Sequence, residues 1–441
     1  MQLKPYPEYK KAGVSWIGSI PAHWPEKRAK YYFKEIDERS QTGDEEMLSV
    51  SHITGVTPRS QKNVTMFKAE SNVGQKRCRP GDVVINTMWA WMSALGVANN
   101  AGIVSPAYGV YRPINDQEYE TYYLDHLLRI EGYRSEYICR STGVRSSRLR
   151  LYPDKFLSMR VICAPWEEQQ AIAKFLKAQN LLFRKFIRNK RKQIELLQEQ
   201  RNVLTCEAVK SNDTVWLRFG VVANQVERPI GREDELVYTP IGLFNRGRGI
   251  FHKEATQGKE LGDSTFFWVK PGDLVFSGQF AWEGAVAIAQ PKDENWIASH
   301  RYPIFRNNPE LVEAAYLYSF FTTKDGDLLL NLHSRGAAGR NRPLNPRTLG
   351  KEKIPIPPMN LQQEIARSLD LEFKFKNDVV KQISFIQEFR SRLIADVVTG
   401  KVDVRGIEVP EDAEEAIFDE EDDILGSSAL MGENTEPEGE E

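Results

Sequence analysis

Two long segments of the chain carry apolar residues at helical spacing, with charged and amide side chains between them. In residues 165–210 the apolar positions recur at intervals of three, four or seven: Ile172, Leu176, Phe183, Ile187, Ile194, Leu197, Leu204 and Ala208. Residues 358–402 repeat the pattern: Ile365, Leu369, Phe373, Val380, Ile383, Ile386, Leu393 and Val397. This spacing is typical of an amphipathic helix with a coiled-coil seam. The sequence therefore predicts two helices of about 40 residues, each a rod of about 60 Å.

These two helices are expected to pair with each other. Each predicted helix begins with proline, followed by acidic or amide side chains, as helix starts do. A single helix of this kind cannot bury its apolar stripe alone, and a connection through an intervening domain permits an antiparallel pair. The alternative is that each helix packs only on its own domain. Pairing is favoured because the rods are longer than a small domain and carry charge around most of their surface.

The segments that precede the helices have a different pattern. Short apolar runs such as "GDVVI", "YGVYR", "GDLVF" and "AVAIA" alternate with Gly, Pro, Asn and Asp. Runs of this length between turn residues predict strands in a mixed domain. We therefore divide the chain into an N-terminal segment (1–24), a first domain (25–164), a central helix (165–210), a second domain (211–357), a C-terminal helix (358–402) and a tail (403–441).

An internal repeat runs through both halves of the chain. "RPGDVVINTMWAWMSALGVA" from Arg79 matches "KPGDLVFSGQFAWEGAVAIA" from Lys270 at a separation of 191 residues. "PWEEQQAIAKFL" matches "PMNLQQEIARSL" at 193, and "KQIELLQEQR" matches "KQISFIQEFR" at 189. A period this long indicates a duplicated domain with its connector. The expected fold class is α+β, with two similar α+β domains separated by two long antiparallel coiled-coil helices in an internal pseudo-twofold repeat.

An arginine-rich loop is part of this repeat. "STGVRSSRLRLYP" from Ser141 matches "SRGAAGRNRPLNP" from Ser334 at a separation of 193 residues. Guanidinium groups can donate to phosphate oxygens or guanine edges, and most such contacts position a duplex without reading its bases. An ordinary solvated loop is the alternative, which the repetition disfavours. The predicted DNA contacts are Arg145, Arg148, Arg150, Arg335, Arg340, Arg342 and Arg347.

The charge of the chain is unevenly distributed. Overall it is −2, but residues 403–441 hold sixteen acidic side chains and one Arg, which leaves 58 basic and 45 acidic side chains in residues 1–402. A body with a net charge of +13 favours a polyanionic partner. The tail is too polar to fold alone, so we expect a disordered acidic appendage. An intramolecular competitor for the basic surface is the alternative role.

Two further repeated features invite a functional interpretation, and we expect both to be structural. Pro80, Gly81 and Asp82, with Pro271, Gly272 and Asp273, are typical turn residues. The aromatic groups "WAW" (89–91) and "FAW" (280–282) could stack on bases, but nothing indicates a single-stranded or flipped substrate. Core packing is the favoured interpretation for these aromatic residues.

The sequence lacks the signatures of the common enzyme and membrane classes. It has no phosphate-binding loop, dinucleotide fingerprint, methylase signature or nucleophile elbow, and Asp154 and Asp293 have no evident partners for a nuclease centre. Its six histidines show no ligand spacing, so no metal site is expected. Four scattered cysteines and the absence of a signal core or apolar span fit a cytoplasmic protein that does not contact a membrane.

The order of these motifs resembles the specificity subunits of Type I restriction-modification enzymes. The resemblance extends to about residue 402 and is carried by "YPEYKKAGVSWIGSIPAHW", both Gly-Asp turns, "VICAPWEEQQAIAKFL" and "IPIPPMNLQQEIARSL". It implies two target-recognition domains, each reading half of a split double-stranded DNA sequence, and helical spacers that dock two methyltransferase subunits. It also implies restriction subunits, with S-adenosylmethionine and ATP bound by the partners and no cofactor or catalytic residue in this chain. The acidic tail departs from the family pattern.

Two other classes remain open at this point. A self-sufficient dual-domain DNA-binding regulator or architectural protein would carry the same basic loops without methyltransferase partners. A nuclease with an unrecognised active site is a third class, which the missing signatures disfavour. Co-purification of a methyltransferase subunit, its absence, or metal-dependent cleavage by the isolated chain would separate the three classes.

Overall fold

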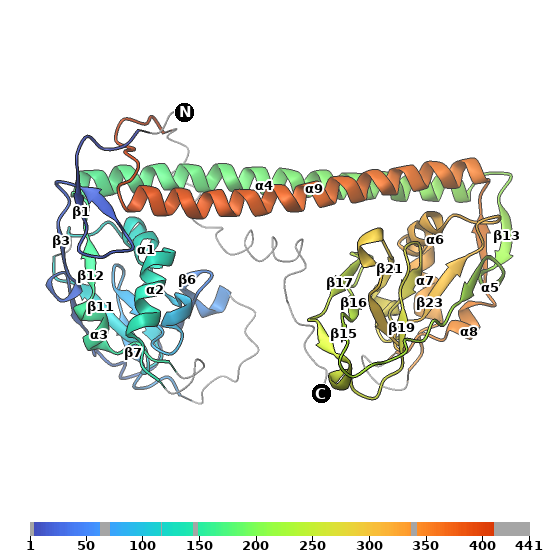
Figure 1. Cartoon of the computed structure of the whole chain (residues 1–441), viewed down its shortest axis with the longest axis horizontal. Coiled ribbons are helices and arrows are strands. Elements are labelled where there is room, and N and C mark those ends of the chain that lie inside the picture. Colours follow the sequence, from blue (N-terminus) through green and yellow to red (C-terminus); the bar gives the residue numbers. More distant parts are fainter. Residues whose placement is uncertain (1–3, 62–70, 116, 144–148, 337–341, 410–441) are drawn as a thin grey trace. The chain divides into compact units, whose positions relative to one another are not determined.

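The computed structural model of the chain describes residues 4–61, 71–115, 117–143, 149–336 and 342–409. Its internal contacts group the chain into two compact units, residues 1–188 with 381–441 (unit 1) and residues 189–380 (unit 2). Both boundaries fall inside long helices, α4 (Trp166–Val209) and α9 (Met359–Val398). Each unit therefore contains one domain and one part of each long helix (Figure 1).

Unit 1 is built around an antiparallel sheet. In its described part, four strands pair in the order β4-β11-β8-β9, and two-stranded ladders join β1 to β2, β3 to β12, β5 to β6 and β7 to β10. The strands are β1 (Tyr9–Lys11), β2 (Ser19–Pro21), β3 (Glu26–Arg28), β4 (Phe33–Glu35), β5 (Leu48–Ser51), β6 (Gly55–Pro58), β7 (Lys76–Cys78), β8 (Val83–Ile85), β9 (Leu95–Val97), β10 (Gly102–Val104), β11 (Gly109–Pro113) and β12 (Arg160–Ile162).

Unit 2 repeats this topology. Its described strands form a four-stranded sheet in the order β14-β23-β20-β21, with ladders that join β13 to β24, β15 to β18, β16 to β17 and β19 to β22. The strands are β13 (Val215–Arg218), β14 (Ala223–Gln225), β15 (Val237–Tyr238), β16 (Ile241–Leu243), β17 (Ile250–His252), β18 (Thr256–Gln257), β19 (Phe266–Trp268), β20 (Leu274–Phe276), β21 (Val286–Ile288), β22 (Ile297–Ser299), β23 (Ile304–Asn307) and β24 (Lys353–Ile356).

Short helices follow each sheet in the same order. The third helix of each set, α3 or α8, begins with proline at its first position, where a missing N–H is harmless. The helices that follow the sheets are α1 (Thr121–Arg129), α2 (Glu131–Arg140) and α3 (Pro153–Ser158) in unit 1, and α6 (Ala314–Phe321), α7 (Lys324–Leu332) and α8 (Pro346–Leu349) in unit 2. A further short helix of unit 2, α5 (Phe219–Val222), comes before its four-stranded sheet. The predicted α+β fold with an internal repeat is confirmed.

Both faces of each central strand are buried. On β8, Val83 and Ile85 join one apolar cluster, whereas Val84 joins another. On β20, Leu274 and Phe276 join one cluster and Val275 the other. Because successive side chains of a strand point to opposite faces, a strand covered on both faces is apolar throughout. This explains the continuous runs "DVVI" and "DLVF" in the sequence.

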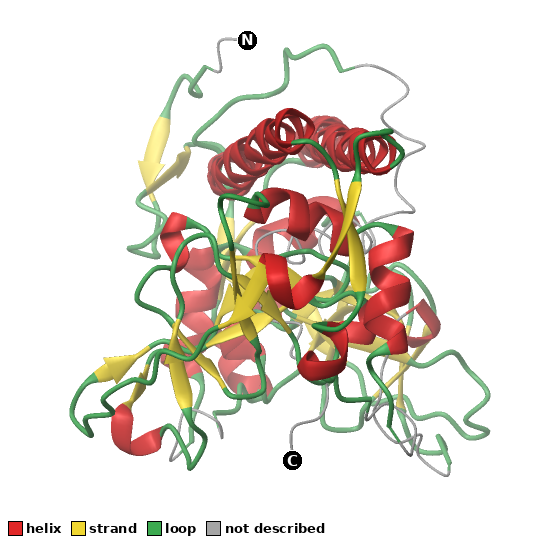
Figure 2. Cartoon of the chain, turned by 90° about the vertical axis from the view of Figure 1, so that its right-hand side faces the viewer, coloured by secondary structure: helices red, strands yellow, loops and turns green. Residues whose placement is uncertain are grey.

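The two long helices pair side by side and antiparallel within each unit. In unit 1, the rings of Phe183 and Phe389 meet edge to face at 6.2 Å, and Arg390 Nε donates to Asn180 Oδ1 at 2.7 Å. Figure 2 shows α4 and α9 close to end-on, next to each other. In unit 2, Lys190 Nζ lies 5.4 Å from the ring centroid of Phe375. Positions later in α4 thus meet positions earlier in α9, and the predicted antiparallel pairing is confirmed.

Most of the predicted seam is buried. Ten positions are less than one tenth exposed: Ile172, Leu176, Ile187, Ile194, Ala208, Ile365, Leu369, Ile383, Leu393 and Val397. The side chains of Leu197, Leu204 and Ile386 are half-buried. Val380 differs from the prediction, because Val379 is the fully buried residue and Val380 is half-buried. The buried positions 365, 369, 372, 379 and 383 keep the heptad spacing, which puts Glu372 and Val379 in the seam in place of Phe373 and Val380.

The long helices pack on the domains as well as on each other. In unit 1, Ile172 and Leu176 of α4 share an apolar cluster with Leu393 of α9 and with domain residues. In unit 2, Ile365 and Leu369 of α9 do the same with Ala208 of α4. Pairing and packing on the domain, which the sequence presented as alternatives, therefore occur together.

A buried ion pair lies between the helices of unit 2. Arg201 Nε donates to Glu372 Oε2 at 2.8 Å, and both side chains are less than 5% exposed. Arg201 also donates to Thr322 Oγ1 at 3.0 Å, next to α6, and lies over the ring of Tyr318. A buried charge is stable only when its partner and its other hydrogen bonds are in place. This cluster therefore fixes the register of α4, α9 and α6.

The repeated Gln-Gln motif has a structural role in each unit. Gln169 is fully buried, accepts from the backbone N–H of Glu120 and donates to the carbonyls of Glu118 and Ala164. Gln362 accepts from Glu313 N–H at 2.8 Å in the same way and donates to two backbone carbonyls. Each glutamine thereby joins the start of a long helix to the loop before α1 or α6.

Glu168 joins the N-terminal segment to the start of α4. Its carboxylate accepts from Tyr6 Oη and Trp24 Nε1, both at 2.9 Å, and lies 2.7 Å from His23 Nε2. Arg405 Nη1 lies 3.5 Å from the same carboxylate. The N-terminal segment is therefore part of the unit 1 core.

The acidic tail begins later than the sequence indicates. Residues 403–409 pack on unit 1: Asp403 N–H donates to Lys4 O at 2.8 Å, and Val404 is 2% exposed. Gly400, with φ +74°, ends α9, and a Cβ there would come within 2.4 Å of Pro21 Cδ. Residues 410–441 lie outside the described part of the chain. The expected disorder of the tail stays a prediction for those residues.

We expect Glu372→Gln to lower the free energy of unfolding of unit 2 by about 3 kcal/mol, because it leaves the Arg201 guanidinium buried without a counter-charge. Urea unfolding followed by tryptophan fluorescence measures this. The matched control is Glu388→Gln, which breaks an exposed pair with Arg392 and should cost less than about 1 kcal/mol. Equal effects of the two substitutions would contradict the assigned role of the buried pair.

Candidate nucleic-acid interface

The two arginine-rich loops occupy matching places in the two units. Each follows the second short helix of its unit and precedes the third. The first is closed by reciprocal backbone hydrogen bonds between Thr142 and Arg150 at 3.0 Å, and the second by a bridge between Ser334 and Leu344. The repeated sequence thus gives a repeated loop base.

Each loop is docked on the strand that carries the Gly-Asp turn. Leu151 N–H donates to Thr87 O at 2.9 Å just after β8, and Leu344 N–H donates to Gly278 O at 2.8 Å just after β20. Both leucines are buried, which explains why leucine is repeated in this loop. The loops are therefore held by the sheet.

The structure describes four of the seven predicted arginines. Arg150, Arg335 and Arg347 are exposed, whereas Arg342 is half-buried. Arg145, Arg148 and Arg340 lie outside the described residues, so their contacts stay a prediction.

Ion pairing separates these arginines from the structural ones. Arg112 makes two hydrogen bonds with the buried Asp82, and Arg228 makes two with the buried Asp273. The hydrogen bonds that Arg112 donates to Asp82 are the largest cause of the raised pKa of Arg112. Within the described ranges, none of the four loop arginines pairs with a carboxylate: Arg150, Arg335, Arg342 and Arg347. Exposed cations without a counter-ion are available to an anionic ligand.

Arg342 differs from the other loop arginines. Its guanidinium lies over the ring of Trp282 at 5.0 Å, and its Nε donates to Ser334 O at 3.3 Å. These contacts hold the second loop against the aromatic turn η6 (Ala281–Glu283). Arg342 therefore positions the loop, and a further contact with DNA stays a prediction for this residue.

A groove of about 940 Å³ lies at the base of the second loop, within unit 2. Arg335, Arg347, Lys351 and His333 supply cationic or donor groups to it, and Gln225 lies on its strand side. His333 contacts Thr348 Oγ1 at 2.9 Å and Glu352 at 3.4 Å. Lys351, His333 and Gln225 were not predicted, because only folding brings them next to the loop.

The matching surfaces of the two units carry different charges. Asp154, at the start of α3, is the repeat partner of Arg347, at the start of α8, at a separation of 193 residues. Asp154 is paired only with the adjacent Lys155 among described residues, at 3.5 Å. The two loop bases are therefore held in similar ways, but the charges beside them differ.

The Gly-Asp turns are structural, as predicted. Gly81 and Gly272 have φ values of +88° and +81°, which favour glycine. Asp82 accepts from Arg79 N–H and Asp273 accepts from Lys270 N–H, each at 2.8 Å. Each aspartate thus closes its own turn. Asp82 also holds Arg112 of β11, and Asp273 holds Arg306 of β23 as well as Arg228.

The aromatic groups differ from the core-packing prediction. Ala90 and Ala281, at their centres, are the fully buried residues, whereas Trp89 is 50% exposed. Trp91, Phe280 and Trp282 are half-buried. The reason is the 3₁₀ turn at this place, η3 (Ala90–Met92) in unit 1, which directs the small residue inward and the rings outward. Core packing is therefore wrong for Trp89, which is exposed, whereas Phe280 packs against an apolar cluster of unit 2.

Asp293 has a partner that the sequence did not reveal. Its carboxylate lies 2.7 Å from His252 Nε2, and the imidazole is stacked on Trp296 at 3.6 Å. Asp293 is 1% exposed and also caps a turn, so the group is a structural clamp. Across the described residues, no three His, Cys, Asp or Glu side chains lie together in a way that could hold a metal ion. No helix in the described ranges is both long and apolar enough to cross a membrane.

Comparison with known proteins gives structural matches only. No protein-family model and no curated protein matches the sequence. A chain from a structure on complex assembly and conformational transition of the type I R-M system is 15% identical, with a TM-score of 0.53, over 86% of this chain and 98% of that chain. That likeness shows a shared fold.

Two other solved structures match at lower scores. The HsdS subunit from Thermoanaerobacter tengcongensis is 14% identical, with a TM-score of 0.45, over 87% of this chain and 98% of its own. The Type-I restriction-modification S subunit from M. genitalium is 11% identical, with a TM-score of 0.40, over 85% and 96%.

We expect the loop arginines to carry salt-dependent DNA binding. Replacing Arg145, Arg148 and Arg150 with Ala should weaken binding and reduce the slope of log affinity against log salt by up to about one for each lost phosphate contact. Replacing Arg335 and Arg347 should do the same through unit 2, as should the set Arg340, Arg342 and Arg347. Fluorescence titrations at several salt concentrations measure both quantities.

The matched control is Arg232→Ala, which removes an exposed arginine of unit 2 that donates to Gly262 O. It should leave affinity and slope close to those of the unmodified protein. If the loop variants had the same affinity and salt dependence as this control, the loops would not contribute to DNA binding.

Proposed function

We propose that this chain is the DNA-specificity subunit of a Type I restriction-modification enzyme. One observation carries the proposal: the same sheet-docked loop, with unpaired exposed arginines, occurs in two domains of one chain. Each copy belongs to a unit that also contains half of an antiparallel helix pair. The shared fold with a chain of the type I R-M system supports it.

In this proposal each domain reads one half of a bipartite double-stranded DNA target. The net charge of +13 in residues 1–402 supports a polyanionic ligand. The loop arginines hold the phosphate backbone, and side chains around them read base edges. The exchange of Arg347 for Asp154 supports different half-sites for the two domains.

The paired helices would dock two methyltransferase subunits and, through them, restriction subunits. Exposed apolar side chains on both helices support a partner-binding role, since such side chains are normally covered. They are Leu182, Phe385 and Phe389 in unit 1, and Leu196, Val203 and Leu371 in unit 2, each at least half exposed. Methylation and cleavage would then belong to the partners, which would bind S-adenosylmethionine and ATP, and this chain would have no cofactor of its own.

Purification from the source cell tests the proposal. We expect a methyltransferase subunit to co-purify in about two copies, and sequencing of methylated DNA to give one bipartite motif. Purification without such a subunit would support a self-sufficient DNA-binding regulator. Metal-dependent cleavage by the isolated chain would support a nuclease. Either result would overturn the proposal.

We also expect the helix pair to set the gap between the half-sites. Seven residues added between Arg188 and Lys192, and seven between Val380 and Lys381, keep the apolar seam in phase and lengthen the pair by about 10 Å. At about 3.4 Å per base pair, the preferred spacer should grow by up to about three pairs. Each added pair also turns the DNA by about 34°, so the shift can be smaller and the affinity lower.

Methylation of a DNA library that varies only in its spacer, with the partner subunits present, measures this shift. Lengthening one helix alone is the control, because it puts the seam out of phase and should destabilise the pair. An unchanged spacer in the doubly extended protein, or altered half-sites, would show that the helices do not set the distance.

A further inference from the structure

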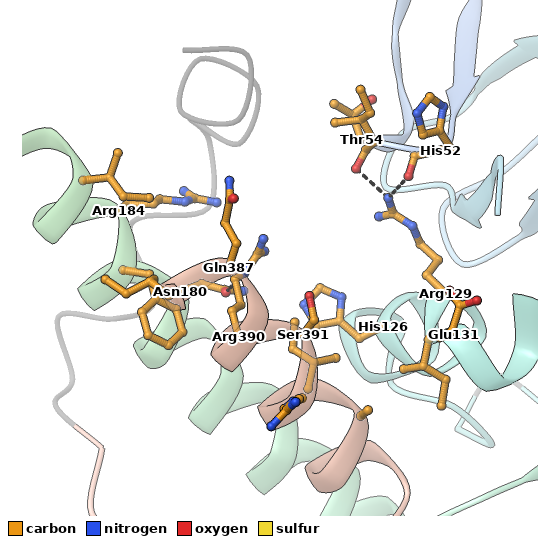
Figure 3. A pocket seen from close by; sticks show the side chains of 18 residues that line it. His52, Thr54, His126, Arg129, Glu131, Asn180, Arg184, Gln387, Arg390 and Ser391 are labelled. Carbon is orange, nitrogen blue, oxygen red and sulfur yellow. Dashed lines mark hydrogen bonds between the residues drawn. The ribbon is translucent and has the colours of Figure 1, made fainter. Parts of the chain in front are cut away.

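A cavity of about 510 Å³ lies within unit 1, where the domain meets the paired helices. The turn between β5 and β6 and the junction of α1 with α2 form one side, and α4 and α9 form the other (Figure 3). Neither the arginine loops nor the proposed DNA contacts belong to it. Its chemistry therefore needs a separate explanation.

The lining combines apolar walls with an excess of positive charge. Ile130, Phe183, Ile187, Ile386 and Ile394 supply the apolar surface. Among the described lining residues, four are arginines, one is a carboxylate and two are histidines: Arg129, Arg184, Arg390, Arg392, Glu131, His52 and His126. Two of these arginines also pair with carboxylates beside the cavity, Arg129 with Asp125 and Arg392 with Glu388. Such a cavity favours a ligand that carries both negative charge and apolar groups.

Hydrogen bonds fix several of these groups in place. Arg129 Nη2 donates to the carbonyls of His52 and Ile53 at 2.9 and 2.5 Å. Arg390 Nε donates to Asn180 Oδ1 at 2.7 Å. The cationic wall is thus preorganised, which lowers the entropy cost of binding.

Two buried nitrogens of the lining have no hydrogen-bond partner among the described residues: His126 Nε2 and Arg129 Nε. The side chain of His126 is only 11% exposed. Burial and the nearby charges of Arg129 and Arg134 also lower the pKa of His52, although Asp125 pairs with Arg129 and Glu131 pairs with Arg134. Arg129 Nε is a buried donor without an acceptor, and such a donor points to a ligand that supplies one.

We propose that this cavity binds a carboxylate-rich peptide with apolar side chains, and that its occupant is residues 414–425 of the same chain. This segment, "EEAIFDEEDDIL", places Ile417, Phe418, Ile424 and Leu425 among seven carboxylates. It lies outside the described residues. Its composition matches the two parts of the lining, because the carboxylates suit the arginines and the apolar residues suit the isoleucine and phenylalanine wall.

The place where the described chain ends supports this occupant. Asp403 is bridged to Lys4, Val404 is buried, and Ile407 and Val409 pack against the unit 1 core. The acidic segment is therefore tethered to the unit that holds the cavity, with four residues between Val409 and Glu414. A short tether of this kind gives an effective concentration of about millimolar, so a weak contact is well occupied.

Photo-cross-linking in the full-length protein tests the proposal. Phe418 is replaced by a photoreactive benzoylphenylalanine, and the products are mapped by mass spectrometry. We expect cross-links to residues 126–131, 183–187 and 386–395 within the same chain. The control places the same group at Asn434, outside the segment, where cross-links should be several-fold weaker and not confined to the cavity.

Charge reversal gives the second readout. Arg184→Glu with Arg392→Glu should lower the cross-link yield about five-fold or more, as expected for the loss and reversal of two partly exposed ion pairs. The matched control, Arg28→Glu with Lys30→Glu, makes the same charge change at exposed positions of unit 1 away from the cavity. Glu420→Lys with Glu421→Lys changes the segment instead, so a loss of yield there cannot arise from misfolding of the cavity. High salt should lower the cross-link yield in the unmodified protein and in each variant.

The proposal is overturned if cross-links from position 418 spread over both units or join two chains. It is also overturned if the cavity variant and its control, Arg28→Glu with Lys30→Glu, lower the cross-link yield equally. None of these outcomes depends on DNA binding. Failure here would therefore leave the proposed specificity function untouched, and failure of that function would leave the cavity result intact.

Discussion

The apolar stripes of the two long helices must be buried, and neither helix can do this alone. Each stripe is covered twice, by the other helix and by a domain core, so that Ile172 and Leu393 belong to one cluster in unit 1 and Ala208 and Ile365 to another in unit 2. Because the chain enters unit 2 through α4 and leaves it through α9, only an antiparallel pair satisfies both stripes. Unit 1 is thereby built from segments on both sides of unit 2 in the sequence, whereas unit 2 is one continuous segment.

Apolar burial alone would leave the helices free to slide, and buried polar groups prevent this. The Arg201–Glu372 pair and its bond to Thr322 fix α4, α9 and α6 of unit 2 in one register. In unit 1, Asn180 holds Arg390. Gln169 and Gln362 repeat a single arrangement at the helix starts, where an unpaired buried amide would be costly. The polar residues thus determine how the apolar surfaces meet, and so where each loop is presented.

The sequence predicts those features that depend on local or repeated pattern. Helix limits, the antiparallel seam, the Gly-Asp turns and the position of the loops all follow from spacing. It does not predict contacts between distant residues. Nothing local identifies Glu372 as buried, shows that Val379 replaces Val380 in the seam, or brings Asp403 to Lys4. The core-packing prediction was wrong for Trp89 for a related reason, because the backbone of a 3₁₀ turn determines which of three consecutive residues points inward.

In the candidate interface, the sequence likewise does not predict which charged side chains are paired and which are free to meet a ligand. Some arginines have a structural role and others are exposed charges, and the residues that each arginine contacts in the folded chain determine which role it has. Arg112 and Arg228 form ion pairs with buried aspartates, and Arg342 packs on the indole ring of Trp282. Arg150 and Arg347 are exposed and pair with no described carboxylate. A count of basic residues cannot separate these groups. The buried aspartate–arginine pairs and the loop base occur in both halves of the repeat, whereas Asp154 in one half is matched by Arg347 in the other. The two halves therefore share the residues that hold the loop and differ in the surface that a ligand would meet.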